Sequence, residues 1–155
     1  MGHAFYYNTP IGQIMIGEKD NKITHLLFDG NSIPSGYIIK ETPILAEGNK
    51  QLQEYFKGQR KEFKLELNPC GTEFMKKVWE SLRKIPYGET RSYKDIAISI
   101  GHDKAYRAVG LANNRNPIAI IIPCHRVIGA NGSLVGYGGG LDIKTFLLDL
   151  ERTHK

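Results

Sequence analysis

Short runs in which apolar and polar residues alternate occupy much of the first half of the chain, and such alternation is typical of strands with one buried face. Residues 12–18 alternate in this way, Asp20-Asn21-Lys22 indicates a turn, and residues 23–28 predict a return strand. A strand over residues 4–7 is expected before this hairpin, and another over residues 62–67 after it. The pattern therefore predicts an antiparallel meander.

Apolar residues three or four positions apart predict helices elsewhere in the chain. One helix is predicted over residues 43–57, with Gly58 at its end, and a second over residues 72–84, with Thr72 as its N-cap. A last helix is predicted over residues 141–151. Its apolar residues are expected to be buried, namely Phe146, Leu147 and Leu150.

Two short helices are predicted between these segments. Ser92 is a candidate cap for residues 93–100, Gly101 suits the end of that helix, and Asp103 is expected to begin another over residues 104–113. Such a pair is a helix-turn-helix candidate, although similar pairs occur in many proteins that never bind DNA. The second helix of the pair has small residues around Arg107, which would suit close approach to a partner or tight packing against the core: Ala105, Ala108, Gly110 and Ala112.

A thiol, an imidazole and a guanidinium follow one another where the apolar run 118–122 ends, in the sequence Pro123-Cys124-His125-Arg126-Val127. A free thiol has a pKa of about 8.5, so only roughly 3% of it is the nucleophilic thiolate at neutral pH. A neighbouring base that lowers this pKa would activate it, directly or through a water. Pro123 predicts a rigid turn here. A structural cysteine is the simpler alternative, because free cysteine is among the most buried residue types.

Composition limits the function in several ways. The sequence has 155 residues with two cysteines, Cys70 and Cys124, too few for a disulfide framework or a four-cysteine zinc site. We read Cys70 as non-catalytic. The start lacks the features of a signal peptide, and no apolar run reaches the roughly 20 residues of a membrane span. These features favour a reduced, cytoplasmic protein with no membrane partner.

Charge is distributed unevenly between two predicted domains, which meet at the chain-breaking cluster Asn68-Pro69-Cys70-Gly71. Residues 1–68 contain eight Lys/Arg and eight Asp/Glu, for a net charge of zero. Residues 69–155 contain thirteen Lys/Arg and eight Asp/Glu, for a net charge of +5. A basic domain favours an anionic partner such as nucleic acid, and a basic surface without a partner is the alternative.

Several motifs keep a fixed order over residues 72–151. They are Gly-Glu-Thr-Arg-Ser-Tyr at 88–93, Arg-Ala-Val-Gly at 107–110, Asn-Asn-Arg-Asn-Pro at 113–117, Pro-Cys-His-Arg-Val at 123–127, Gly-Tyr-Gly-Gly-Gly-Leu at 136–141 and Leu-Glu at 150–151. In these motifs the chain resembles the O6-alkylguanine-DNA alkyltransferases, the methylated-DNA–protein-cysteine methyltransferases. The first half resembles the family more loosely, through Thr9-Pro10-Ile11-Gly12 and the meander.

The resemblance implies an α/β (α+β) fold, with an N-terminal antiparallel sheet and helix of the ribonuclease H-like type and a C-terminal winged helix-turn-helix domain. It implies DNA repair by stoichiometric, irreversible transfer of the alkyl group from O6-alkylguanine, and from O4-alkylthymine, to a cysteine. The damaged base would be flipped out through the minor groove. The partner would be double-stranded DNA containing alkylated bases, bound by a monomer without cofactor or metal.

Roles for individual residues follow from the same resemblance. Cys124 would accept the alkyl group, His125 would act as its base through a water, and Glu151 would orient the imidazole. Tyr93 would assist flipping and give a proton to the departing guanine. The guanine pocket would comprise Tyr137, the amide of Gly138, the backbone of Val127, and Asn116, which links the recognition helix to the reactive turn.

DNA binding would centre on Arg107, which enters the duplex and fills the gap left by the flipped base. Tyr106 departs from the family pattern, because members usually have a small residue there. The remaining DNA-binding residues implied by the resemblance are Ala105, Tyr106, Gly110, Ser92, Asn116 and Arg126.

Two other classes of protein would also fit some of these residues. A cysteine hydrolase would use a cysteine and a histidine, with an acyl substrate and an oxyanion hole. A winged-helix module with a structural cysteine would bind DNA and transfer nothing. Mass spectrometry after incubation with methylated DNA distinguishes the three, because only the alkyltransferase gains an alkyl group.

Overall fold

Two compact units make up the protein in the computed structural model, which describes residues 1–134 and 136–155. The first unit comprises Met1–Cys70 with Pro117–Ala119, and the second comprises Gly71–Asn116 with Ile120–Lys155. Three residues of the second predicted domain thus belong to the first unit. They do so because residue 118 bridges to Leu26, with the Leu26 amide donating to Pro117 O at 2.9 Å.

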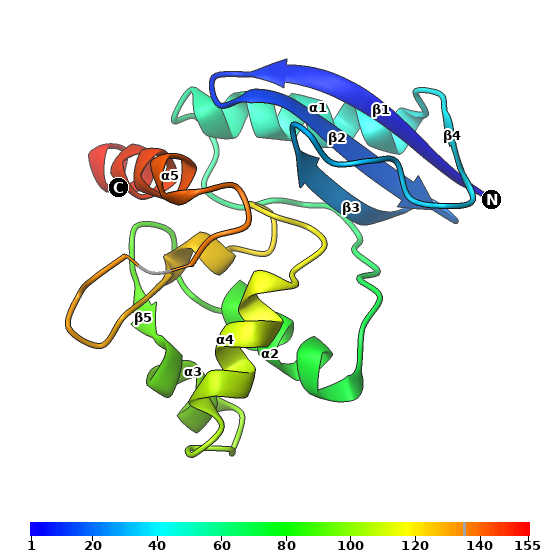
Figure 1. Cartoon of the computed structure of the whole chain (residues 1–155). Helices are drawn as coiled ribbons and strands as arrows, with labels where there is room; N and C mark the ends of the chain where they lie inside the picture. The colour runs from blue at the N-terminus through cyan, green and yellow to red at the C-terminus, as the bar shows by residue number, and fades with distance from the viewer. Residues whose placement is uncertain (135) are drawn as a thin grey trace. The chain divides into compact units, whose positions relative to one another are not determined.

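A four-stranded sheet forms the first unit (Figure 1). β1 (Gly2–Thr9), β2 (Gly12–Lys19) and β3 (Lys22–Phe28) form the predicted antiparallel meander, and β4 (Tyr37–Ile39) pairs in parallel with β1. The order is β3-β2-β1-β4. The β2–β3 turn places Asp20 and Asn21 at φ 54° and 63°, as a type I′ hairpin turn requires.

Helix α1 (Pro43–Phe56) covers one face of this sheet and packs against β1 and β2. Its buried residues lie on one side of the helix, as the apolar spacing predicts. Gly58 follows the helix with a φ of +73°, which confirms it as a suitable terminator. The core between helix and sheet contains Ile14, Ile16, Ile23, Leu45, Leu52 and Tyr55.

The strand predicted over residues 62–67 is wrong. Only Leu67 pairs with another strand, in an isolated bridge to Ile23. The backbone of Lys64 instead bonds the buried side chain of Gln51, which accepts from its amide at 2.9 Å and donates to its carbonyl at 3.2 Å. The alternation of residues is real, but a helix side chain replaces the neighbouring strand as the hydrogen-bond partner.

The second unit is mainly helical. α2 (Glu73–Arg83), α3 (Tyr93–Ser99) and α4 (Tyr106–Asn114) pack on one another, with Trp79 donating to Ala112 O at 2.9 Å. A short parallel pair, β5 (Arg91–Ser92) and β6 (Val127–Ile128), flanks the 3-10 turn η1 (Cys124–Arg126), and α5 (Leu141–Thr153) packs against that turn.

Side chains cap the first two of these helices as the sequence predicts. Thr72 accepts from the Met75 amide at the start of α2. Ser92 and Asp95 form a reciprocal capping box at the start of α3, and Gly101 follows that helix with a φ of +78°. α4 differs from its prediction, since it begins at Tyr106 and its N-cap is Ala105, without a side-chain cap hydrogen bond, rather than Asp103.

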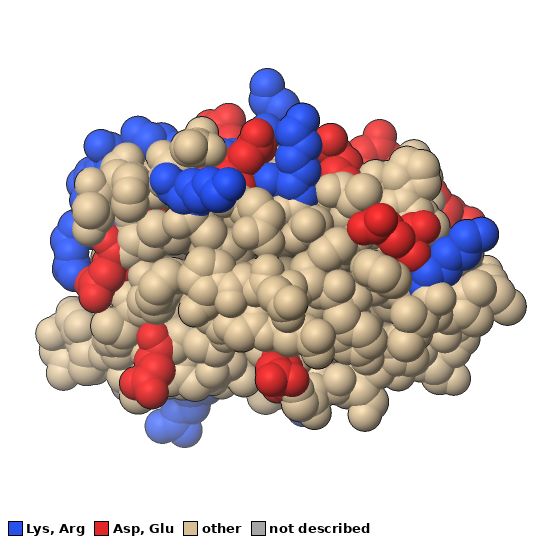
Figure 2. Space-filling model, turned by 90° about the horizontal axis from the view of Figure 1, so that it is seen from above, with Lys and Arg blue, Asp and Glu red and all other residues tan. Residues whose placement is uncertain are grey.

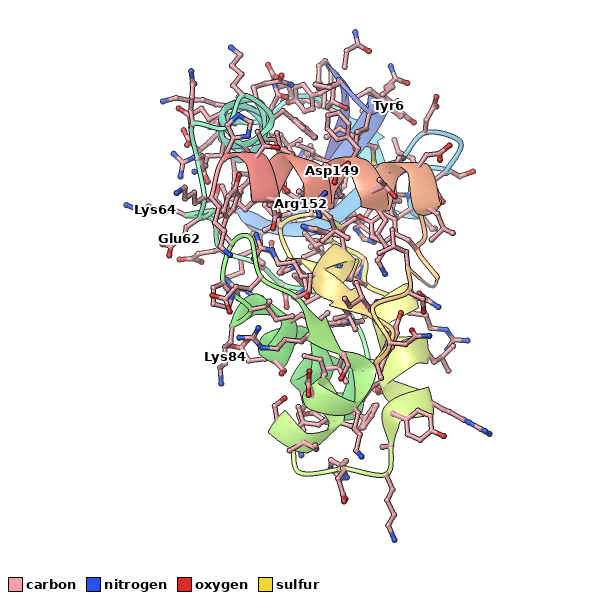
Figure 3. All side chains as sticks on the ribbon, turned by 90° about the vertical axis from the view of Figure 1, so that its left-hand side faces the viewer. Tyr6, Glu62, Lys64, Lys84, Asp149 and Arg152 are labelled. Atoms are coloured by element: carbon pink, nitrogen blue, oxygen red, sulfur yellow. The ribbon has the colours of Figure 1, made fainter. Side chains whose placement is uncertain are left out.

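The inward face of α5 differs from the predicted one. Leu147 is buried as expected, but Phe146 is 38% exposed and Leu150 is half-buried. The inward positions are 144, 147 and 151, spaced three and four apart, so Lys144 and Glu151 are buried beside Leu147 in place of the predicted Phe146 and Leu150. On the exposed side, Arg152 donates to Asp149 (Figure 3).

The surface seen in Figure 2 has lysine and arginine side chains beside aspartate and glutamate side chains, around a centre without charged residues. This face therefore offers no broad basic surface. No helix in the described residues combines the length and the apolar composition that crossing a membrane requires.

Gln51→Met should destabilise the protein by about 1 kcal/mol, because it removes both hydrogen bonds to the Lys64 main chain, which is only partly buried. Urea unfolding followed by circular dichroism measures the difference. Lys50→Met, at an exposed position of the same helix, is the matched control and should change the free energy of unfolding by less than about 0.5 kcal/mol. Equal effects of the two substitutions would contradict the assigned role of Gln51.

Candidate active site

The reactive turn begins at Pro123, which precedes η1 with a φ of −80° and confirms the predicted rigid turn. Cys124, His125 and Arg126 form the turn and are 5%, 0% and 7% exposed. Consecutive residues of a 3-10 helix lie about 120° apart around its axis. The three side chains therefore leave the turn in different directions, although His125 and Arg126 both reach Glu151.

Glu151 is the hub of these contacts. Its carboxylate is 1% exposed and lies 2.6 Å from Nε2 of His125. Arg126 binds it through two bonds, with Nε donating to Oε1 at 2.7 Å and Nη2 donating to Oε2 at 3.1 Å. Arg126 also donates to Ile85 O at 2.7 Å, and the Gly88 amide donates to Oε1 of Glu151 at 3.3 Å. The carboxylate thus joins α5 to the reactive turn and to the loop after α2.

The charges of this cluster fix its protonation. Burial alone would raise the pKa of Glu151, but the hydrogen bonds of His125 and Arg126 and the charge of Arg126 outweigh it and hold that pKa well below its usual range. An ionised carboxylate only accepts, so Nε2 of His125 carries the proton. Burial lowers the pKa of His125, with Glu151 opposing the change, and favours neutral imidazole. Nδ1 is then left as a basic nitrogen, buried and without a hydrogen-bond partner among the described residues.

The thiol itself differs from the prediction. The sequence predicts that a neighbouring base lowers its pKa, whereas burial raises the pKa of Cys124. Hydrogen bonds from Asn116 and Tyr137 and the charge of Lys144 oppose this increase. The environment therefore shields the thiol from water and also supplies groups that favour the thiolate.

Two asparagines of the α4 end hold the main chain around the thiol. Asn116 donates to Ile122 O at 2.8 Å, which places it between helix and turn as the sequence predicts. Asn113 is 1% exposed and donates to Cys124 O at 3.3 Å, a contact that the sequence analysis missed. Its position in the repeated Asn-Asn pair at 113–114 was the available signal, since a polar residue on the inner face of an amphipathic helix needs a partner.

Lys144 is the second residue that the sequence analysis missed. It is completely buried, and its Nζ donates to Val127 O at 2.6 Å. Its place three residues before Leu147 and seven before Glu151, on one face of the last helix, was the signal. The backbone of Val127 was expected to line the guanine pocket, and Lys144 already engages one lone pair of its carbonyl.

Aromatic groups complete the surroundings of the thiol. Tyr93 is half-buried, and burial raises its pKa, with the charge of Cys124 adding to the effect. Burial, followed by the charge of the nearby Cys124, keeps the pKa of Tyr137 well above the usual range. Both phenols are therefore proton-bearing at neutral pH. Gly138 is exposed in the loop before α5.

The predicted DNA-binding residues separate into two groups. Tyr106 and Arg107 are exposed at the start of α4, with the guanidinium 5.9 Å from the Tyr106 ring centre, and Ala105 and Gly110 are half-buried on the same helix or its cap. Arg126 is different, because its guanidinium is buried and bound to Glu151 and Ile85 O. The prediction that Arg126 binds DNA is therefore wrong, and its charge holds the site together instead.

Comparisons with known proteins agree on one family. Residues 73–153 match the DNA binding domain of 6-O-methylguanine DNA methyltransferase, and residues 3–69 match its ribonuclease-like domain. A methylated-DNA–protein-cysteine methyltransferase of Methanosarcina barkeri is 53% identical over 156 residues, covering 96% of this chain and 98% of the relative. A constitutive one of Bacillus subtilis is 50% identical over 157 residues, covering 95% of each.

Solved structures give the same result. The O6-methylguanine methyltransferase of Mycobacterium tuberculosis has a TM-score of 0.92 at 45% identity, covering 100% of this chain and 95% of that one. A structure of the Mycobacterium tuberculosis protein in complex with DNA has a TM-score of 0.93 at 45% identity, covering 98% and 94%.

Fold and site together therefore define a DNA-repair methyltransferase of mixed α/β architecture. The chain belongs to the 6-O-methylguanine DNA methyltransferase family, that is, the methylated-DNA–protein-cysteine methyltransferases, which are single-turnover enzymes. Among the described residues, no group of three or more His, Cys, Asp or Glu side chains could hold a metal ion.

Glu151→Gln should cost about 3–5 kcal/mol of stability at neutral pH, because it leaves the buried Arg126 charge unpaired. The contribution of Glu151 is fully present above its unfolded pKa of about 4.3 and is lost as the pH falls from there toward the lower folded pKa. The difference in free energy of unfolding between the native chain and Glu151→Gln should therefore decrease below about pH 4. Urea unfolding at a series of pH values measures this difference.

Asp149→Asn is the matched control, because Asp149 is an exposed carboxylate on the same helix and should contribute little at any pH. If the loss of unfolding free energy caused by Glu151→Gln stayed constant from acid to neutral pH, the assigned role of the carboxylate would be refuted.

Proposed function

We propose that this protein repairs DNA by transferring the alkyl group of O6-alkylguanine to Cys124, once per molecule. Family membership supports the reaction class. The observation that carries the assignment to Cys124 is the buried His125–Glu151 pair directly beside it, which leaves a basic nitrogen in the same turn. Cys70, by contrast, is exposed.

The reaction would proceed as a displacement at the alkyl carbon. Nδ1 of His125 takes the thiol proton through a water, and the thiolate sulfur forms a bond to carbon while the carbon–O6 bond breaks. The electron pair of that bond goes to O6, and Tyr93 supplies a proton so that guanine departs neutral. The raised pKa of Tyr93, caused by burial, keeps the phenol protonated until then.

The product would be a thioether at Cys124. Breaking it would require a second nucleophile and a good leaving group, and a thioether sulfur is a poor leaving group. This chemistry explains why one molecule would act once. It also requires no cofactor, since the protein itself is the acceptor.

Double-stranded DNA would be the partner. The net charge of +5 in residues 69–155 favours a polyanion, and the related protein of Mycobacterium tuberculosis has been solved in complex with DNA. We place α4 against the duplex through Tyr106 and Arg107, with a monomer as the binding form. The reactive thiol is 5% exposed, so a base stacked in a duplex could not reach it.

The alkylated base would therefore be flipped through the minor groove into the pocket beside Tyr137 and Asn116. Flipping costs a few kcal/mol, and a poorly paired lesion such as O6-alkylguanine or O4-alkylthymine lowers that cost. Arg107, exposed at the start of α4, would enter the duplex and occupy the space that the base leaves.

Incubation with a stoichiometric amount of O6-methylguanine duplex should add one methyl group to Cys124 and none to Cys70. Peptide mapping by mass spectrometry reads both sites in one sample. Cys124→Ser should keep its affinity for the duplex and gain no methyl group. Methyl on Cys70, or more than one methyl transferred per molecule, would overturn the proposal.

Arg107→Lys distinguishes two possible roles of Arg107, namely filling the space left by the flipped base and attracting the phosphates by charge alone. Lysine keeps the charge but lacks the planar group that stacks between bases, so duplex transfer should slow about tenfold or more while the salt dependence of binding stays nearly unchanged. Rapid-quench transfer assays at several salt concentrations measure both quantities.

The free base O6-benzylguanine needs no flipping, so the loss caused by Arg107→Lys should shrink on it. Arg115→Lys is the matched control, because Arg115 is an exposed arginine just after the end of α4. Equal slowing on duplex and free base would mean that Arg107 supports the pocket, and the intercalating role would have to be abandoned.

A further inference from the structure

Helix α4 has two flanks, one on each side of Arg107. With 3.6 residues per turn, one flank lies about 60–120° from Arg107 around the helix axis and the other about 40–100° in the opposite direction. The first, the inner flank, contains Gly110 and Asn113. The second, the outer flank, consists of three exposed residues: Ala108, Leu111 and Arg115, the last at the C-cap.

The inner flank faces the thiol. Asn113 donates to Cys124 O at 3.3 Å. The ring of Tyr93 lies against Gly110, with two ring carbons 3.8 Å from the point where a Cβ of residue 110 would stand. A damaged base that enters the pocket beside Cys124 must therefore leave the duplex on the inner flank.

The width of a helix determines what the outer flank meets. An α-helix with its side chains is about 10–12 Å across, whereas the minor groove of B-DNA is about 6 Å wide. A helix that enters this groove therefore contacts both of its walls, and each wall is one strand. Because the damaged strand lies on the inner flank of α4, the undamaged strand lies on the outer flank.

The side chains of the outer flank suit contact with a DNA strand. One exposed leucine is common on protein surfaces, but Leu111, which is 51% exposed, lies between a small residue and an exposed arginine. The flank from Ala108 to Arg115 is about 10 Å long, which equals about three base-pair steps. α4 contains no Asp or Glu, so no acidic side chain of the helix repels the phosphates.

We propose that the outer flank of α4 binds the undamaged strand opposite the lesion, with Leu111 against deoxyribose and Arg115 on a phosphate. The inference rests on the proposed repair of alkylated duplex DNA through the minor groove, and it assigns the two flanks of the helix to different strands. The outer flank holds the undamaged strand in place while the damaged nucleotide leaves the other strand.

The first test compares duplex with single-stranded DNA. Fluorescence anisotropy measures the affinity of the Cys124→Ser chain, which transfers nothing, for an O6-methylguanine duplex and for the damaged strand alone. Adding Leu111→Ala should lower the duplex affinity about three- to tenfold, the loss expected when half a leucine side chain is no longer covered. The affinity for the single strand should fall less than about twofold, because the partner of Leu111 is absent from it.

Ile98→Ala is the matched control, because Ile98 is an apolar residue of α3 that is 54% exposed, and it should change neither affinity. Leu111→Met keeps an apolar side chain and should restore the duplex affinity. Equal losses on duplex and single strand would place Leu111 on the damaged strand, and an unchanged duplex affinity would remove it from the interface. Either result would overturn the assignment of Leu111.

The second test uses the salt dependence of duplex binding. Arg115→Gln should make the slope of log K against log salt concentration shallower by about 0.9, the change expected for one lost phosphate contact. Arg115→Lys retains the charge and should keep the native slope. Leu111→Ala should also keep it, since an apolar contact releases no counterion. A native slope in Arg115→Gln would overturn the phosphate contact.

Transfer from the free base O6-benzylguanine distinguishes an interface role from a structural one. Neither Leu111→Ala nor Arg115→Gln should slow this reaction in the chain that retains Cys124, because the outer flank faces away from the thiol. Slower transfer from the free base would mean that these residues support the pocket, which would contradict the proposal. A native chain that gains no methyl group on Cys124 would refute the proposed function, while the affinities, which involve no transfer, would still decide the role of the outer flank.

Discussion

One buried carboxylate, that of Glu151, determines how the reactive turn can work. It accepts from Arg126 and lies against His125, so a residue near the end of the last helix fixes two consecutive side chains of the turn. Breaking a buried ion pair costs far more than the pair contributes against an apolar replacement. Such a contact therefore suggests a functional constraint, and here the constraint is the orientation and tautomer of the imidazole beside Cys124.

A second constraint connects the proposed DNA-binding helix to the same turn. The exposed start of α4 has Tyr106 and Arg107, while its end places Asn113 on Cys124 O and Asn116 on Ile122 O. Trp79 ties the same helix to α2 through Ala112 O. A helix bonded at one end to the nucleophile's main chain can hold the DNA at its other end in register with the thiol, without a flexible connection between the two.

The sequence predicts the parts of the structure that depend on local rules. The Asp20-Asn21 turn, the caps at Thr72 and Ser92 and the turn after Pro123 all follow from the conformational preferences of those residues. The resemblance also predicts the pairing of His125 with Glu151 beside Cys124, and the structure contains this pair.

The errors concern residues whose roles depend on tertiary partners. Residues 62–67 alternate like a strand, yet a helix side chain takes the place of the neighbouring strand. Arg126 looks like a DNA contact in a basic domain, and Lys144 looks like a surface residue on an amphipathic helix. Arg126 is buried because it binds the carboxylate of Glu151, and Lys144 is buried because it donates to the carbonyl of Val127. Both partners are distant in sequence, so neither periodicity nor composition predicts these contacts.

The central claim is that burial keeps His125 neutral while Glu151 holds its proton on Nε2, leaving Nδ1 as the base for Cys124. Nitrogen-15 NMR of histidine-labelled protein, with His125→Gln to assign the signal, reads the tautomer and the charge of this ring directly. The account predicts one neutral tautomer, protonated on Nε2, throughout about pH 7 to 8. A proton on Nδ1, or an imidazolium over that range, would contradict it, because the nitrogen assigned as the base would then be occupied.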